Sequence, residues 1–192
     1  MHREIYEVNL QSLCVGVKPF SPIEFALQIF GYFNMFFDSV GESFKLDKNS
    51  TYGSNHRFYF HREGERTFHG NQYVKTRSVN SIGRDFCKRT GLIGLLLDLA
   101  SIGMEYSKDL EDVNNFGITN YYRSVKAAGE SLGSVLFGKI GVDMGMLIGS
   151  VGSPLGGLVG GVIGGVGGAL LGQFIGGQLV DNYYRDNKLF IP

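Results

Sequence analysis

The stretch Met144–Val180, MGMLIGSVGSPLGGLVGGVIGGVGGALLGQFIGGQLV, decides the fold. It has 37 residues, 14 of them glycine, and contains no Asp, Glu, Lys, Arg or His. Small residues recur in it every four positions, in one file of Gly152, Gly156, Gly160, Gly164, Gly168, Gly172 and Gly176 and a second of Gly145, Gly149, Ser153, Gly157, Gly161, Gly165 and Ala169. Residues four apart share a helix face, so the files predict one smooth groove for close backbone approach. Each glycine inside a helix costs about 1 kcal/mol relative to alanine, so we interpret the stretch as membrane-inserting, where tight helix packing offsets that cost.

A break at Pro154 divides this region into two arms, because proline cannot continue a helix ladder without loss. Leu155–Val180 has 26 residues, or about 39 Å of helix, enough to cross a hydrocarbon core of about 30 Å. The preceding arm, Ser131–Val151, carries Lys139 and Asp143, which share a face at a spacing of four and can pair or line a polar passage. Charges and two tyrosines follow the second arm directly, as in a membrane anchor.

The N-terminal part predicts a second apolar helix. Ser21, Pro22 and Glu24 form a capping box with proline at the first helical position. The helix is expected to run through the uncharged stretch Phe25–Phe37 and to end near Gly41. Thirteen residues are too few for a membrane span, so this is either a core helix or an aromatic helix at a membrane interface.

The remaining elements are predicted from propensity and spacing. Two short strands are expected near Ile5–Leu10 and Leu13–Val17, followed after the helix by a polar loop over Lys45–Asn55. A β-hairpin is expected from Arg57–His61 and Thr67–Val79, joined by the turn Arg62–Glu65. Helices are expected at Ser78–Arg89 and Gly91–Asp112, then a turn at Asn114–Gly117 and an amphipathic element at Thr119–Asp143.

These elements predict a mainly α fold with a small β-hairpin in the N-terminal half and a C-terminal glycine-zipper helical hairpin that can insert in membranes. Residues 1–90 form a soluble α+β region that binds a carrier or partner, 91–118 a connecting helix, and 119–192 the glycine-zipper membrane-inserting region. In a soluble form, the Phe-rich helix 23–37 and the helix 91–104 are expected to cover the glycine tract.

Composition and residue spacing argue against several other functional classes of protein. The net charge is zero, which disfavours a nucleic-acid binder. Cys14 and Cys87 fit no metal or redox spacing and are expected to be free thiols, and the N-terminus does not read as a signal peptide. The histidines of the predicted β-hairpin, His56, His61 and His69, show no metal-binding or catalytic spacing. We therefore expect no catalytic, cofactor-binding or metal-binding residues.

Other interpretations of the glycine tract remain open. It could be a low-complexity coil, although its other residues are mostly Val, Leu, Ile and Met rather than Ser. It could be a β-rich or amyloid-like segment, although a period of four does not favour a period of two. A helical hairpin that is shielded until release is compatible with membrane insertion.

The chain resembles a known class of toxins over roughly residues 70–180. The segment Gly70-Asn-Gln-Tyr-Val-Lys-Thr76, then Ile82-Gly83, the helix that begins Gly91-Leu-Ile-Gly94 and the long glycine zipper resemble the C-terminal toxin regions of bacterial polymorphic toxins, including RHS-type and type VI secretion effectors. The resemblance implies an interbacterial toxin without catalytic residues. It also implies a cognate immunity protein. The chain departs from the resemblance in that no delivery domain is visible, so we expect either a secretion carrier or chaperone, or that the chain is a fragment of a longer one.

Three functions follow as hypotheses. The first is a pore-forming antibacterial effector that is made in the bacterial cytoplasm, is secreted without a signal peptide, and depolarises or permeabilises the inner membrane of a target cell. Its partners are membrane lipid, the carrier, the immunity protein and other copies of itself, but not nucleic acid. The second is a non-toxic membrane or envelope structural protein. The third is a hydrolase or nuclease that uses the His56–His69 hairpin.

Overall fold

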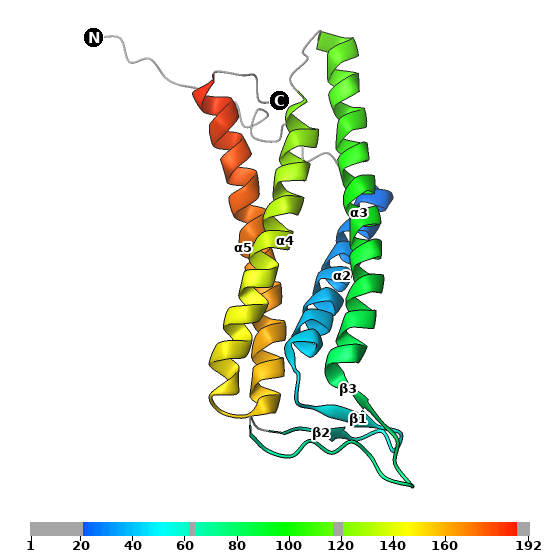
Figure 1. The fold of residues 1–192 in the computed structure, drawn as a ribbon. Coiled ribbons are helices and arrows are strands. Elements are labelled where there is room, and N and C mark those ends of the chain that lie inside the picture. The colour runs from blue at the N-terminus through cyan, green and yellow to red at the C-terminus, as the bar shows by residue number, and fades with distance from the viewer. Residues whose placement is uncertain (1–20, 62–63, 117–120, 188–192) are drawn as a thin grey trace, which may run out of the picture.

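The computed structural model describes residues 21–61, 64–116 and 121–187. Within them the order is α2 (Pro22–Leu46), β1 (Thr51–Gly53), β2 (Phe58–Tyr59), β3 (Thr76–Ser78), α3 (Val79–Phe116), α4 (Tyr122–Ser150) and α5 (Pro154–Asp186). Figure 1 shows a bundle of helices with the sheet at one end, near the turn between α4 and α5. The mainly α fold with a C-terminal helical hairpin is confirmed. The two strands predicted near the N-terminus lie outside the described residues.

Helix α2 begins as predicted but ends later. The hydroxyl of Ser21 accepts a hydrogen bond from the backbone N–H of Glu24 at 3.1 Å, and the Glu24 carboxylate accepts one from the N–H of Ser21 at 3.0 Å. Gly41 does not end the helix, which continues to Leu46. A Cβ at Gly41 would lie 2.8 Å from the Sγ of Cys87, so this glycine allows α2 to pack closely on α3.

The sheet differs from the predicted hairpin. β1 lies in the centre and pairs antiparallel with both β2 and β3, so the segments on either side of Arg62–Glu65 do not pair with each other. The central strand falls in the segment Lys45–Asn55, which was expected to be a loop. Thr51 and Gly53 are buried there, and this tertiary burial outweighs the low strand propensity of the segment.

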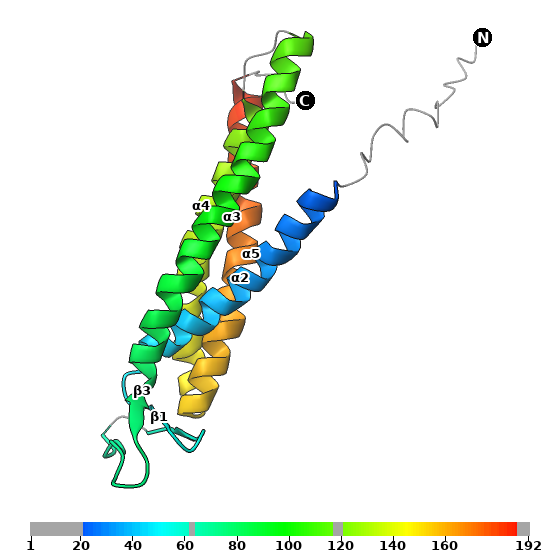
Figure 2. The ribbon, with the colours of Figure 1, turned by 90° about the vertical axis from the view of Figure 1, so that its right-hand side faces the viewer.

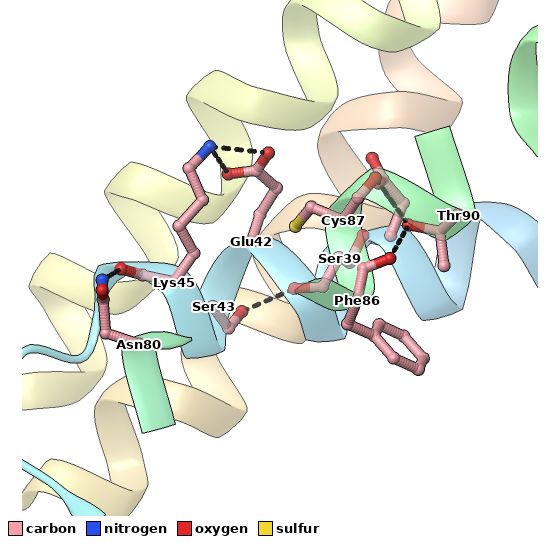
Figure 3. A network of polar contacts seen from close by, with 9 residues as sticks. Ser39, Glu42, Ser43, Lys45, Asn80, Phe86, Cys87 and Thr90 are labelled. Atoms are coloured by element: carbon pink, nitrogen blue, oxygen red, sulfur yellow. Dashed lines mark hydrogen bonds and ion pairs between the residues drawn. The ribbon is translucent and has the colours of Figure 1, made fainter. Parts of the chain in front are cut away.

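Helix α3 is continuous where two helices were expected. It runs through Thr90 and Gly91 without a break and includes Asn114, which was expected to begin a turn. The Thr90 hydroxyl donates a hydrogen bond to the Asp38 carboxylate of α2 at 2.9 Å (Figure 3). This contact with α2 lies at the position of the expected break, so packing between helices supports the continuous helix.

The interior of the bundle is lined largely by small residues. Among the described residues, the fully or nearly buried apolar side chains are few, namely Val79, Tyr122, Val142, Leu158, Ala169 and Tyr184. Glycine and serine occupy many other buried positions, including Gly161, Gly165, Ser39 and Ser43. Large apolar side chains lie mostly on the outside, which reverses the usual distribution in a soluble domain.

Candidate membrane-insertion hairpin

The two helices of the hairpin pack along a ladder of paired glycines. The break that separates them is confirmed: α4 ends at Ser150, Gly152 lies in the turn, and the Ser153 hydroxyl caps α5 by accepting a hydrogen bond from Gly156 N–H at 2.9 Å. In each pair, a Cβ on at least one glycine would lie less than 3.0 Å from a backbone atom of the other. The pairs are Gly129–Gly176, Gly133–Gly172, Gly141–Gly164, Gly145–Gly160 and Gly149–Gly156.

The pairing of α4 with α5 keeps the same spacing at the one position where α4 has a larger residue in place of a glycine. Phe137 stands at the position opposite Gly168, and a Cβ on Gly168 would lie less than 3.0 Å from the Phe137 carbonyl oxygen. The Phe137 side chain is 37% exposed, and a Cβ on Gly172 would lie 2.7 Å from the Cβ of Phe137, so the larger residue is accommodated beside two glycines of α5. The backbones of α4 and α5 therefore approach closely along most of the hairpin, which only very small residues permit.

The two glycine files do not form one groove, contrary to the sequence-based expectation. On α5, the file from Gly156 to Gly176 faces α4, whereas Gly161 and Gly165 of the second file face α2 and α4 side chains. A Cβ on Gly161 would lie 2.6 Å from the Oγ of Ser43, and a Cβ on Gly165 would lie 2.6 Å from the Oγ of Ser39. Gly145 and Gly149, which were placed in the second file, lie on α4 and pair with the first file. The turn at Ser153 separates them from the rest of their predicted file.

The outward faces of the hairpin are apolar. The helices Tyr122–Ser150 and Pro154–Asp186 are both long and apolar enough to cross a membrane. The side chain of Val151 at the turn is 89% exposed, and that of Ile163 in the middle of α5 is 69% exposed. Further exposed apolar side chains are Leu132, Leu136, Ile140, Met144, Leu147, Ile148, Leu155, Val159, Leu171, Phe174 and Leu179. An apolar surface this long is typical of contact with lipid or with another protein.

Helix α2 covers the glycine tract only in part. Its small residues Ser39 and Ser43 provide the contact with α5, whereas the phenylalanines within residues 23–37 are exposed. The Phe33 side chain, for example, is 58% exposed. The segment 91–104 of α3 likewise exposes Leu92, Ile93, Leu95, Leu96 and Leu99. The expected cover of the tract by helices 23–37 and 91–104 is thus found only in part: α2 covers Gly161 and Gly165, through two serines that lie beyond residue 37.

Polar contacts gather at the open end of the hairpin, away from the turn. The Tyr122 hydroxyl donates a hydrogen bond to the Asp181 carboxylate at 2.6 Å, and Lys126 forms an ion pair with the same carboxylate at 2.9 Å. The ring of Tyr122 also packs edge-to-face on Tyr184 at 5.1 Å between centroids. These contacts join the start of α4 to the end of α5, outside the uncharged stretch of the tract.

The N-terminus of α4 is capped by a side chain from α3. Tyr121 precedes the helix with a left-handed backbone and makes no side-chain cap. The buried Asp109 carboxylate instead accepts hydrogen bonds from the N–H of Arg123 at 3.2 Å and of Ser124 at 2.9 Å, and from the Ser124 hydroxyl at 2.7 Å. Asp112 adds an ion pair with Arg123 at 3.0 Å. A carboxylate at this position satisfies free backbone N–H groups and complements the helix dipole.

Lys139 and Asp143 are both exposed and lie in different surroundings. Lys139 lines a groove between α4 and the α2/α3 pair, within electrostatic range of Asp38, whereas Asp143 is not among the lining residues. The structure has no ion pair between Lys139 and Asp143, two residues that it describes.

The histidines named in the alternative enzyme hypothesis form no metal-binding cluster among the described residues. His56 shares a hydrogen bond of 3.0 Å with the Tyr52 hydroxyl, and the Nε2 of His61 accepts one from the Phe68 N–H at 3.1 Å. Within the residues that the structure describes, no group of three or more His, Cys, Asp or Glu side chains is placed to hold a metal ion. The hydrogen bonds of His56 and His61 lie within the sheet and its loops.

Two contacts of the hairpin were missed by sequence reasoning. Ser39 and Ser43 have the same spacing of four as the glycines, and this signal was available in the sequence. The cap from Asp109 had no local signal, because Asp109 and Ser124 are 15 positions apart. Comparison of the chain with protein-family models, curated proteins and solved structures gave no match.

Proposed function

We propose that this protein is a pore-forming antibacterial effector whose α4/α5 hairpin inserts in the inner membrane of a target cell and depolarises or permeabilises it. The observation that carries the proposal is the reversed distribution of side chains on the hairpin. Glycines fill the contact between α4 and α5, and large apolar side chains cover the outside. In lipid this arrangement satisfies the backbone internally and places apolar atoms against the acyl chains.

The positions of charge support insertion with the turn first. From Met144 to Val180 the hairpin carries no charged residue, and the turn at its tip is apolar. At 1.5 Å per residue, Asp143 lies about 12 Å and Lys139 about 18 Å from Val151 along α4, which places both near the centre of a bilayer about 30 Å thick. Ionisable groups at this depth usually face water, so we propose that Lys139 and Asp143 line the passage.

The toxin role adds partners to the proposal. A protein that permeabilises bacterial membranes requires an immunity protein in the cell that makes it, and a carrier or chaperone that covers the apolar surface before delivery. The exposed faces of α2, α3 and the hairpin are suitable surfaces for such a carrier. In the membrane, contacts between several hairpins are proposed to enclose the passage.

Release of a trapped dye from vesicles tests the proposal. The full-length protein is added to vesicles of phosphatidylethanolamine and phosphatidylglycerol that contain no other protein, and fluorescence is followed with time. Release is expected, together with a loss of membrane potential when the protein is expressed in bacteria without an immunity protein. His61→Ala with His69→Ala is the matched control and should release dye as the wild type does. Intact vesicles at all protein concentrations would contradict the proposal.

A further inference from the structure

The bundle consists of two helix pairs that touch mainly at two places. Figure 2 shows that α2 crosses the α4/α5 pair obliquely. At one place Ser39 and Ser43 of α2 pack on Gly165 and Gly161 of α5. At the other, near the open end of the hairpin, Asp109 and Asp112 of α3 bind the first turn of α4. Between these places lies a groove with a volume of about 900 Å³.

Among the described residues, no hydrogen bond or ion pair joins the charged side chains on the two walls of this groove, and Lys139 of α4 attracts Asp38 of α2 only at longer range. Asp98 of α3 and Glu130 of α4 both line it, and neither forms a hydrogen bond or ion pair within the described part of the chain. Nearby ion pairs stay within a helix pair: Glu24 binds Lys108 between α2 and α3 at 2.6 Å, and Lys126 binds Asp181 between α4 and α5. The ion pairs therefore stabilise the α2/α3 pair and the α4/α5 pair separately, and few polar contacts along the groove join one helix pair to the other.

The contact of the two serines with α5 can separate without loss of hydrogen bonds. The Ser39 hydroxyl donates to the Met35 carbonyl at 2.9 Å within α2. The Ser43 hydroxyl donates to the Ser39 carbonyl at 2.8 Å, also within α2 (Figure 3). Neither hydroxyl needs a partner on α5, so separation of α2 from α5 leaves no buried polar group unsatisfied. The contact depends on packing alone.

The other contact is more difficult to break. Asp109 accepts three hydrogen bonds from the start of α4, and four residues join α3 directly to Tyr121 in the chain. Loss of these bonds would leave a buried carboxylate and two backbone N–H groups of a helix terminus without partners. The two contacts therefore differ in kind: the serine contact is able to open while the aspartate contact holds.

We propose that Ser39 and Ser43 act as a latch that holds the hairpin against α2, and that the hairpin swings out as a unit about the Asp109 contact when it enters a membrane. This inference rests on the proposed function and adds the movement that precedes insertion. In the latched state Gly161 and Gly165 of the second glycine file are covered by α2. In the open state they become free, and lipid covers the outward faces of α4 and α5.

A disulfide across the latch tests the movement. A Cβ at Gly161 would lie 3.2 Å from the Cβ of Ser43, close to the separation of about 3.8 Å in a disulfide, so Ser43→Cys with Gly161→Cys is the suitable pair. The full-length variant also carries Cys14→Ser and Cys87→Ser. Burial raises the pKa of the Cys87 thiol to about 12, so its replacement removes a thiol that is already poorly reactive.

The oxidised variant is expected to release no dye from vesicles, and the same protein after reduction is expected to release it. Equal release in the two states would overturn the latch and leave the proposed function standing. Absence of release by wild type would overturn the proposed function and the latch together.

A second pair of variants tests the latch without a disulfide. Ser43→Leu overpacks the contact with Gly161 and is expected to raise the initial rate of dye release by roughly tenfold, because overpacking shifts the balance towards the open state. Ser43→Ala keeps the side chain small and is the matched control, with a rate near that of wild type. A rate for Ser43→Leu equal to or below that of Ser43→Ala would overturn the latch.

Discussion

The contrast between Gly164 and Gly167 tests the glycine ladder most directly. Both lie in the same uncharged part of α5, three positions apart. A Cβ at Gly164 would lie less than 3.0 Å from the Gly141 carbonyl oxygen on α4, whereas a Cβ at Gly167 meets nothing within 4 Å. Replacement by alanine therefore adds the same methyl group to one helix, at the contact in one variant and away from it in the other.

The expected stability changes have opposite components. Glycine to alanine in a helix gains about 1 kcal/mol at either position, because alanine is the better helix former. At Gly164 the methyl group meets backbone atoms, which cannot rotate away, so α4 and α5 must separate. Overpacking of this kind costs about 1–3 kcal/mol and offsets or exceeds the gain. Gly167→Ala is thus expected to be more stable than Gly164→Ala by about 1–3 kcal/mol.

Unfolding of the full-length variants in mild detergent, followed by far-ultraviolet circular dichroism, measures this difference. Gly167→Ala should exceed wild type in its free energy of unfolding, and Gly164→Ala should equal it or fall below. Equal gains for the two variants would refute the reasoning, because they would mean that α5 does not pack on α4 through the face that contains Gly164. A loss at both positions would refute the assignment of Gly167 to an open face.

Three further predictions follow from other contacts. Asp109→Ala should lower the free energy of unfolding by about 1–2 kcal/mol, because the cap of α4 is lost. Asp112→Ala should change it by less than about 1 kcal/mol, as for other partly exposed ion pairs. Similar losses for the two variants in thermal or urea unfolding would contradict the role of Asp109 as the cap. Burial raises the pKa of Asp38, and the hydrogen bond from Thr90 partly opposes this shift. The ionised carboxylate is therefore less favourable in the folded protein than in the unfolded chain, so stability falls as the pH rises through the raised pKa. Asp38→Asn keeps an acceptor for Thr90 and should stabilise the protein more at pH 7 than at pH 4 in urea unfolding; a gain that is independent of pH would argue against this cause. Phe30→Ser with Phe33→Ser alters two exposed side chains of α2 and should leave unfolding within about 1 kcal/mol of wild type, because surface changes are usually small. Changes above that range would show that these rings are buried in the protein.

The sequence predicted those parts of the fold that depend on local rules. The capping box located the start of α2, and Pro154 located the start of α5, because both act through the backbone of a single turn. The period of four along α5 predicted a close helix contact. It did not identify which helix each file would meet, because that depends on how α2 crosses the hairpin.

The errors share a physical origin in contacts between distant residues. Gly41 is a common type of helix end, but here it permits α2 to pack on Cys87 of α3. The strand Thr51–Gly53 pairs with two segments, one of them more than 20 residues away, and a run of three residues is too short to indicate this pairing. The Asp109 cap likewise required knowledge that the end of α3 meets the start of α4.

The turn between the two helices of the hairpin has a topological consequence. Val151–Ser153 is the only part of the hairpin that must reach the far side of a bilayer when the turn leads, and it carries no charge. Arg123 and Arg185 at the opposite end remain on the side of arrival. In the proposed turn-first insertion no charged loop is therefore translocated, and the electrostatic cost is confined to the two ionisable side chains within α4, Lys139 and Asp143.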